Sequence, residues 1–139
     1  MIGDSAQDDD EALVRAANRA FYDAFERRDL DAMSDVWERS ERVLCVHPGW
    51  KPLRGWGPVS GSFFALFQGP SQLQFILTDE QVETAGSMAW VSVDENILGD
   101  QTGAMVSAVN VFRREEDGPW RMVCHHGSVV TVPSETEED

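Results

Sequence analysis

The sequence predicts an α+β domain in which three helices precede an antiparallel sheet. Apolar residues recur at helical spacing in the first half of the chain, up to Gly69 and Pro70. From residue 73 onward, four segments rich in β-branched and aromatic residues are separated by short links of turn-forming residues. The length of 139 residues and the hydrophobic fraction of 42% are those of one globular domain.

The first helix is predicted from a stripe of apolar residues at i, i+3 and i+4 spacing, and a shorter helix follows it. Asp29 is placed to cap the start of this second helix. Pro58 suits the first turn of a third helix, and Gly69 suits its end. The residues expected to face the core are Leu13, Ala16, Ala17, Ala20, Phe21, Ala24 and Phe25, then Leu30, Met33 and Trp37, then Val59, Phe63, Leu66 and Phe67.

A short β-rich run over residues 41–47 predicts a first strand, which ends at Pro48 and Gly49. The later segments predict consecutive antiparallel hairpins, because the links between them are short. These segments are 73–82, 88–98, 104–113 and 120–130.

The formal net charge of −14 arises mostly at the two ends of the chain. Nine of the 25 acids lie in the first 11 and the last five residues, which leaves 16 acids against 11 basic residues. We therefore expect acidic, solvated tails at 1–10 and 133–139 around a domain at 11–132. Lys51 is the only lysine, and the lack of a basic stripe argues against nucleic acid as a partner.

The start of the sequence has no positively charged region and no apolar run, and no stretch approaches the roughly 20 apolar residues that span a bilayer. We therefore expect a cytoplasmic protein with no membrane attachment. Cys45 and Cys124 lie in apolar, β-like segments, and both thiols should stay reduced in the cytoplasm. The usual phosphate-loop, serine-hydrolase and HExxH motifs are absent from the sequence, so no cofactor is predicted.

Four groups of residues along the chain form motifs. They are Val43 to Trp50 together with Leu53 to Trp56, Asp94 to Asn96, Asn110 to Phe112, and Trp120 to Ser128. These motifs resemble SnoaL-like members of the nuclear-transport-factor-2-like (NTF2-like) superfamily, in its ketosteroid-isomerase-like branch, and the resemblance covers residues 12–131. It implies a cone-shaped, cystatin-like fold with a cavity between helices and sheet, and often a homodimer made through the outer face of the sheet.

The resemblance leaves the activity open, because the superfamily contains isomerases, cyclases, dehydratases, hydrolases, ligand binders and protein-interaction modules. The ketosteroid-isomerase pattern combines an inward acid as base with a tyrosine and a second acid as oxyanion donors. Tyr22 is the only tyrosine and lies on the first helix, so this oxyanion hole is not carried over. Tyr22 is instead a candidate ligand-binding residue.

Glu95 is the first candidate catalytic residue. Alternation along the strand at 88–98 places Glu95 on the same face as Val91, Val93 and Ile97. If this apolar face lines the cavity, desolvation raises the pKa of Glu95 and makes it an effective acid or base near neutral pH. The alternative is a structural ion pair between Glu95 and an arginine.

His126 is the second candidate catalytic residue, because alternation allows only one of His125 and His126 to face inward. The phase that contains Trp120, Met122 and His126 is the more apolar one, which favours His126 as the inward residue. The alternative is a core histidine that hydrogen-bonds the neighbouring strand.

Further polar and aromatic residues are candidates for ligand binding. Asn110 is expected nearly opposite Cys124, where it either orients a ligand carbonyl or satisfies His126. His47, Trp50 and Trp56 lie in a loop region, where binding residues are often displayed. The alternative is that the two tryptophans plug the wide end of the cone.

Two Cys-His pairs raise the question of a metal site. Cys45 with His47, and Cys124 with His126, are each two residues apart, so each pair shares a strand face and the two pairs together offer a zinc tetrahedron. The spacing lacks the tight Cys-x2-Cys turn of structural zinc sites, and packing alone explains such residues. We therefore predict no metal.

Two functions are consistent with the sequence. One is an acid–base enzyme of the isomerase, cyclase, dehydratase or hydrolase type that acts on an apolar small molecule. The other is a non-catalytic ligand-binding or dimeric interaction module whose pocket is plugged by aromatic side chains. An inward carboxylate or imidazole with a shifted pKa and space beside it favours the enzyme, whereas a pocket filled by Trp50, Trp56 and phenylalanines favours the module.

Overall fold

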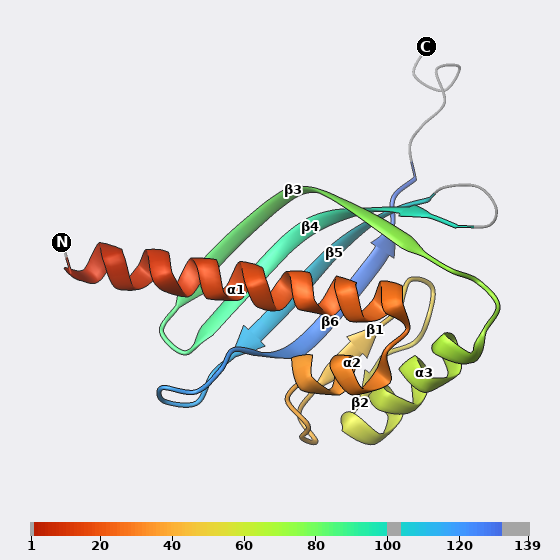
Figure 1. The fold of residues 1–139 in the computed structure, drawn as a ribbon, viewed down its shortest axis with the longest axis horizontal. Coiled ribbons are helices and arrows are strands. Elements are labelled where there is room, and N and C mark those ends of the chain that lie inside the picture. Colours follow the sequence, from red (N-terminus) through yellow and green to blue (C-terminus); the bar gives the residue numbers. More distant parts are fainter. Residues whose placement is uncertain (1, 100–103, 132–139) are drawn as a thin grey trace, which may run out of the picture.

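The computed structural model of the protein describes residues 2–99 and 104–131. Within these residues, three helices pack against a curved, six-stranded sheet, and α1 crosses one face of that sheet (Figure 1). The predicted α+β class, with its helices in the first half of the chain, is confirmed. The helices are α1 (Ile2–Arg27), α2 (Leu30–Val36) and α3 (Trp56–Gln68), and the strands are β1 (Leu44–Val46), β2 (Leu53–Arg54), β3 (Gln74–Ala85), β4 (Met88–Leu98), β5 (Ala104–Arg113) and β6 (Arg121–Val129).

The strand order in the sheet is β2-β1-β6-β5-β4-β3. Strands β3 to β6 form the predicted series of antiparallel hairpins. The sheet differs from the prediction at one edge, where β1 pairs with β6 in parallel and Cys45 lies beside His125. The reason is that the chain enters β1 from the helical layer and runs in the direction of the last strand. The short strand β2 then returns antiparallel to β1, and no pattern in residues 53–54 predicts it.

The buried face of α1 is rotated by about one residue from the predicted stripe. Leu13 is 54% exposed, and Ala16 and Ala20 also face solvent, so the inward orientation predicted for these three residues is wrong. Alanine is small enough to fit either face, so apolar spacing alone did not locate the buried one. Among residues 6–27 of α1, the fully buried ones are Val14, Asn18, Phe21, Tyr22 and Ala24.

Helices α2 and α3 agree with the prediction. The Asp29 carboxylate caps α2 by accepting a hydrogen bond from the backbone N–H of Ala32 at 3.0 Å. Helix α3 begins close to the predicted glycine-proline start and ends directly before the predicted stop. The residues of these two helices and of the α2 C-cap that are fully buried are Met33, Trp37, Val59 and Phe63.

A β-bulge interrupts the side-chain alternation of β3. Thr78 pairs with Asp94 and Gln81 pairs with Ser92, so one extra residue lies in β3 between these pairs. Asp79, within the bulge, has a φ of 52°. Because an extra residue reverses the phase of the residues beyond it, Glu80 lies on the face that packs against α1.

A second β-bulge interrupts β6. Phe112 pairs with Met122 and Val111 pairs with Cys124, which leaves Val123 as the extra residue. Met122 and Val123 are therefore both buried, although they are adjacent in the chain. Beyond this bulge the alternation is the opposite of the one expected from Trp120 and Met122.

Aromatic rings fill much of the space between α1, α3 and the sheet. The ring of Phe21 lies 4.9 Å from that of Tyr22, 6.1 Å from that of Phe63 and 6.4 Å from that of Trp37, centroid to centroid. Phe25 lies edge-on to Phe63 and to further phenylalanines. Edge-on packing is a geometry that aromatic pairs prefer. The interior of the cone is therefore occupied largely by side chains.

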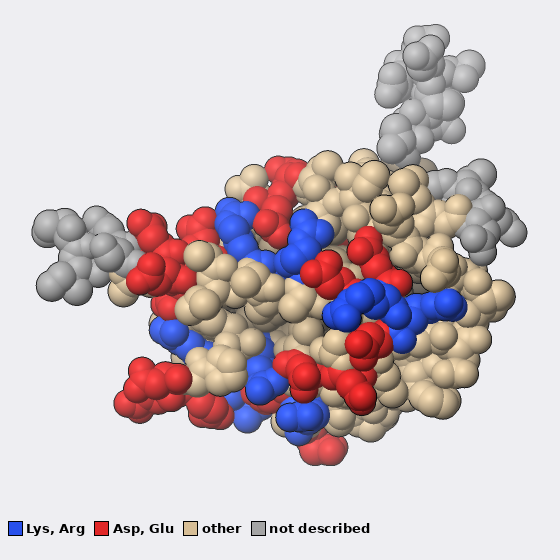
Figure 2. Space-filling view, in the orientation of Figure 1, with Lys and Arg blue, Asp and Glu red and all other residues tan. Residues whose placement is uncertain are grey.

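The two chain ends were predicted to be acidic tails. Helix α1 begins at Ile2, so residues 2–10 are helical, and Asp10 forms an ion pair with Arg114 at 2.9 Å. The C-terminal segment 133–139 lies outside the described residues. Figure 2 shows acidic and basic side chains intermingled on the face that carries α1. In the described part of the chain, no helix combines the length and the apolar character needed to cross a membrane.

Candidate functional site

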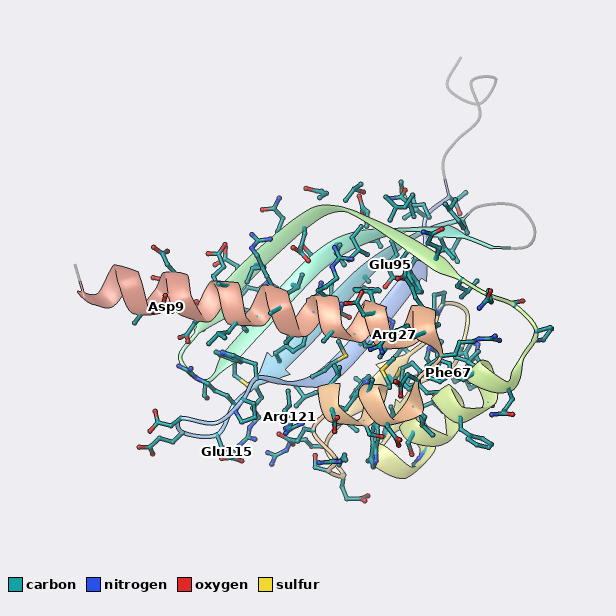
Figure 3. The ribbon with its side chains drawn as sticks, viewed as in Figure 1. Asp9, Arg27, Phe67, Glu95, Glu115 and Arg121 are labelled. Atoms are coloured by element: carbon teal, nitrogen blue, oxygen red, sulfur yellow. The ribbon has the colours of Figure 1, made fainter. Side chains whose placement is uncertain are left out.

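Five polar side chains lie buried between α1 and the inner face of the sheet. Asn18 and Tyr22 come from α1, Glu95 from β4, Asn110 from β5 and His125 from β6. None of the five is more than 3% exposed. Figure 3 shows Glu95 between the sheet and α1. We call these five residues the interior polar network. The inward orientation predicted for Glu95 and Asn110 is confirmed.

Glu95 is held by a tyrosine. The hydroxyl of Tyr22 donates a hydrogen bond to Oε2 of Glu95 at 2.5 Å. Among the described residues Glu95 takes part in no ion pair, so the structural pairing with an arginine that we considered is not what this strand forms. The carboxyl group is therefore buried against a neutral partner.

Asn110 is the centre of the network, because both ends of its side-chain amide are used. Its Nδ2 donates to Oδ1 of Asn18 at 2.8 Å and to the hydroxyl of Tyr22 at 3.1 Å. Its Oδ1 lies 2.6 Å from Nδ1 of His125 and accepts the hydrogen bond from that nitrogen. The three partners come from two different elements, so Asn110 ties α1 to the last strand of the sheet.

The network continues to the surface through the bulge of β3. Nδ2 of Asn18 donates to Oε2 of Glu80 at 2.9 Å. The other oxygen of Glu80 accepts a hydrogen bond from Arg15 at 2.7 Å, and Arg15 also pairs with Glu11 at 3.1 Å. The side chain of Arg15 is 42% exposed, so this end of the chain of hydrogen bonds meets water.

Burial governs the pKa values in the network. It raises the pKa of Glu95 to about 7, although the hydrogen bond from Tyr22 acts in the opposite direction. Burial lowers the pKa of His125 to about 3, with a smaller contribution from the nearby histidines. Burial, followed by the charge of Glu95, raises the pKa of Tyr22. Near neutral pH, Glu95 is therefore protonated in about half of the molecules, while Tyr22 and His125 stay uncharged.

The inward orientation predicted for His126 is wrong. His126 lies on the exposed, outer face of β6, and His125, which is 2% exposed, is the inward histidine. The cause is the extra residue Val123, which shifts the phase between Met122 and the histidines. The same shift places Asn110 opposite His125 and not opposite Cys124, so Asn110 satisfies His125.

His47 forms a second buried polar contact near the network. Its Nε2 lies 2.9 Å from the hydroxyl of Ser62, which itself donates to the carbonyl of Val59 at 2.7 Å, so His47 is the donor of the pair. Burial lowers the pKa of His47 to about 4 and raises the pKa of Cys45 to about 12. Neither Ser62 nor Cys45 is activated as a nucleophile in this arrangement.

Trp50, in the loop before β2, and Trp56, the first residue of α3, do not plug the wide end of the cone together. Trp50 is 44% exposed and lies edge-on to His47, with ring centroids 4.8 Å apart. Trp56 is half-buried, and its ring lies 6.2 Å from that of Trp37. Ligand-binding roles for His47, Trp50 and Trp56 stay predictions.

The two Cys-His pairs face opposite sides of the sheet. Cys45 and His47 are buried on the inner face, whereas His126 and the partly buried Cys124 lie on the other phase of β6, beyond the bulge. Both cysteines are free thiols. In the part of the chain that the structure describes, no group of three or more His, Cys, Asp or Glu side chains is placed to hold a metal ion.

Five hollows bounded by the described residues have volumes between about 70 and 680 Å³, and none of these five is lined by a member of the interior polar network. Leu73 borders two of them, of about 70 and 410 Å³, near the start of β3. Phe25 lines the smaller one and lies 5.0 Å from Phe75, whose ring is 5.2 Å from that of Tyr22. Two phenylalanine rings thus separate this hollow from Glu95's hydrogen-bond partner.

Sequence reasoning missed three residues of this region, namely Asn18, Glu80 and His125. Asn18 lies four residues after Val14 and four residues before Tyr22. A predicted buried face of the helix shifted by one residue would therefore include Asn18. Glu80 belongs to four consecutive polar residues, 78–81, a break in alternation that signals a bulge. No comparable signal marks His125, because its phase depends on the bulge at Val123.

The fold is that of NTF2-like proteins. It is similar to a solved structure from Streptomyces avermitilis named "putative dehydratase from the NTF2-like family", with a TM-score of 0.83 and 39% sequence identity over 90% of this chain and 99% of that chain. The SnoaL-like domain family model matches residues 14–133. The chain therefore belongs to the SnoaL-like domain family.

Two further relatives bear different names. A structure from Thiobacillus denitrificans, named "putative calcium/calmodulin-dependent protein kinase type II association domain", has a TM-score of 0.72 and 38% identity over 84% of this chain and 94% of that chain. The F-box protein SKIP8 of Arabidopsis thaliana is 28% identical over 119 residues, which are 86% of this chain and 50% of SKIP8. The chain spans about half the length of that curated relative.

Proposed function

We propose that this SnoaL-like domain is an acid–base enzyme for an apolar small molecule, with Glu95 as the group that accepts and returns the proton. The observation that carries the proposal is the directed chain of hydrogen bonds that ends on Glu95. His125 donates to Asn110, Asn110 donates to Tyr22, and Tyr22 donates to Glu95. Glu95 is the terminal acceptor of this chain, and its pKa of about 7 suits proton transfer near neutral pH.

The chemistry that fits such a carboxylate is removal of a proton from a carbon next to a carbonyl group. In an isomerisation, the protonated Glu95 then returns the proton to another carbon. In a dehydration, a hydroxyl group on the neighbouring carbon leaves and takes the proton from Glu95, so the products are water and an alkene. The relative named "putative dehydratase" supports this class of reaction, as does the apolar environment, which raises the pKa of Glu95.

We place the ligand at the start of β3, where Leu73 and Phe25 border a hollow. To reach Glu95, the ligand has to displace the ring of Phe75, which packs on Tyr22. A Phe75→Ala variant should therefore bind apolar ketones at least as well as the unchanged protein. The enzyme proposal depends on this opening, because the rings otherwise close the interior.

Deuterium exchange tests the proposed activity without a known substrate. The protein is incubated in D2O with a panel of apolar ketones and β-hydroxy ketones, and NMR detects deuterium incorporation or loss of water. We expect catalysis for at least one compound and a loss of about 100-fold or more in Glu95→Gln. Glu83→Gln, which changes an exposed carboxylate on β3, should leave the rate unchanged. Equal rates in the protein, in Glu95→Gln and in buffer would refute the proposal.

The outer face of the sheet supports a second proposal, a homodimer. This face is opposite to the helices, and six large apolar side chains on it are exposed, as at many protein–protein interfaces. The relative named an "association domain" is consistent with a role in assembly. The exposed apolar residues on this face are Ile76, Met88, Trp90, Leu98, Met105 and Val109.

Two tryptophans with equal exposure provide the test of the dimer. Trp90 lies on the outer face and Trp50 lies in the loop before β2, and each is 44% exposed. Light scattering should give a dimer mass for the unchanged protein and for Trp50→Glu, and a monomer mass for Trp90→Glu. A monomer mass for the unchanged protein at micromolar concentration would rule out the dimer.

A further inference from the structure

Glu80 lies at the edge of the interior and is bound from two sides by donors. Arg15 donates to Oε1 at 2.7 Å, and Asn18 donates to Oε2 at 2.9 Å. An ionised carboxylate accepts hydrogen bonds and cannot donate them. Glu80 therefore forces Asn18 to turn its NH2 group toward β3 and its Oδ1 toward the interior.

This orientation determines that of Asn110. Since Asn18 presents Oδ1, Asn110 has to present its NH2 group to it, and the 2.8 Å contact between these atoms agrees with this. The same NH2 group then also faces the hydroxyl oxygen of Tyr22, at 3.1 Å. The oxygen of Asn110 is left for the opposite side, where it meets His125. Hydrogen-bond partners are what distinguish the two ends of an amide.

Two consequences follow at the ends of the network. Because Asn110 offers only an acceptor to His125, the proton of this neutral imidazole has to lie on Nδ1. Because Asn110 donates to the hydroxyl oxygen of Tyr22, the proton of Tyr22 is free to point at Glu95. Glu80 accepts a hydrogen bond at the surface edge, and it thus sets the donor and the acceptor in each hydrogen bond from Asn18 to Glu95.

We infer that Glu80 is a positioning residue, which fixes the tautomer of His125 and directs the proton of Tyr22 to Glu95. This inference rests on the proposed acid–base role of Glu95 for its functional meaning. Glu80 touches neither Glu95 nor Tyr22 through a hydrogen bond among those in the described residues, so its effect passes through the two asparagines. The β-bulge in β3 is what brings Glu80 to this position.

The isosteric substitution Glu80→Gln should exchange donors and acceptors along the network. Arg15 has only donors, so the amide oxygen of the new side chain faces Arg15 and its NH2 group faces Asn18. Asn18 then has to turn its oxygen toward β3, and Asn110 has to turn its oxygen toward Asn18 and Tyr22. The NH2 group of Asn110 now faces His125, which accepts it only with its proton on Nε2.

Nitrogen-15 NMR of histidine-labelled protein reads this tautomer directly, without any substrate. In the unchanged protein we expect His125 with the proton on Nδ1, in excess over the other tautomer by about tenfold or more. In Glu80→Gln we expect the ratio to invert, with the proton mainly on Nε2. Glu83→Gln removes a carboxylate from the same strand, outside the network, and should keep the original tautomer.

The tautomer of His125 in the unchanged protein can overturn the inference even if a variant fails to fold. A proton on Nε2 of His125 in the unchanged protein would overturn the inference, and so would an unaltered tautomer in folded Glu80→Gln. The outcomes are independent of the proposed function. If the tautomer inverts in Glu80→Gln but no deuterium exchange is catalysed, the inference about Glu80 stands. Only the proposed enzyme activity is then refuted.

Discussion

Strands β4 and β5 are regular, whereas β3 and β6 each contain a bulge, and the two pairs contribute different residues to the interior polar network and to its link with the surface. The regular strands supply Glu95 and Asn110, which simple alternation places inside. The bulged strands supply Glu80 and His125, which alternation places incorrectly. Unbroken periodicity therefore places Glu95 and Asn110, and interruptions of periodicity place Glu80 and His125.

This difference indicates where the network should be sensitive. Asn110 binds several partners, and Glu95 has a strongly raised pKa, so substitution of either residue should have a large effect on stability. Near the bulges, His125 has one hydrogen-bond partner and Asp79 has an unusual backbone conformation, so substitution of either residue should have a smaller effect on stability.

The largest effect is expected for Asn110→Ala. This change leaves the Oδ1 of Asn18 and the Nδ1–H of His125 without partners in a buried site, and it also creates a cavity. The free energy of unfolding should fall by about 3 to 5 kcal/mol. Urea denaturation at pH 7 measures it. A loss below about 1 kcal/mol would show that Asn110 is not the centre of the network.

The next effect is the pH dependence of Glu95→Gln. Because the pKa of Glu95 is about 7 in the folded protein and near 4.5 when unfolded, the folded state binds the proton more tightly, and this contribution to stability is lost as the pH rises from 4.5 to 7. Glutamine does not titrate, so the variant should gain up to about 3 kcal/mol relative to the unchanged protein between pH 4.5 and pH 8.

Urea titrations of both proteins at the two pH values give this difference. Burial lowers the pKa of His47 and His125, which makes stability rise with pH below about 6.5, but both proteins contain these residues and the effect cancels. A difference that is independent of pH would contradict the raised pKa of Glu95.

Two adjacent histidines provide a smaller and matched comparison. His125→Ala removes a buried ring and leaves the oxygen of Asn110 unpaired, and should cost about 2 to 3 kcal/mol. His126→Ala alters an exposed side chain and should change the stability by less than about 0.5 kcal/mol. Denaturation at low protein concentration limits any effect of association. Equal costs, or the reverse order, would mean that the bulge does not select His125.

The smallest effect is expected at the bulge of β3. Asp79 has a φ of 52°, a conformation that is unfavourable for β-branched residues. Asp79→Val should therefore destabilise the protein by about 1 to 2 kcal/mol. Glu83→Val, at an exposed and regularly paired position of the same strand, should change stability by less than about 0.5 kcal/mol. Thermal unfolding of both variants tests whether the bulge is as described.

Much of the fold is predictable from the sequence for simple physical reasons. The helix boundaries follow from Asp29, Pro58 and Gly69, whose backbone preferences and capping ability act locally. The strands β4 and β5 agree with the prediction because their hairpins are short and their alternation is unbroken. The parallel pairing of β1 with β6 is not local, since it depends on how the helices direct the chain across the sheet.

The site is predictable only where periodicity is maintained. Glu95 and Asn110 follow from alternation, whereas the sequence favours His126 over His125 because nothing in it shows that Val123 is an extra residue. On α1, the alanines fit either face, so Asn18 was missed although Tyr22 was selected. The hydrogen-bond partner of Glu95 likewise depends on the tertiary structure, because Tyr22 is 73 residues away in the chain.

Carbon-13 NMR titration of the side-chain carboxyl of Glu95 tests the central claim most directly, with Glu95→Gln used to assign the resonance. The claim is that Glu95 is a buried proton acceptor, held by Tyr22 and poised to exchange its proton near neutral pH. The resonance should therefore titrate with a midpoint near pH 7. A midpoint at or below 4.5, the ordinary value for glutamate, would show that the carboxyl is solvated or ion-paired, and would contradict the proposed role.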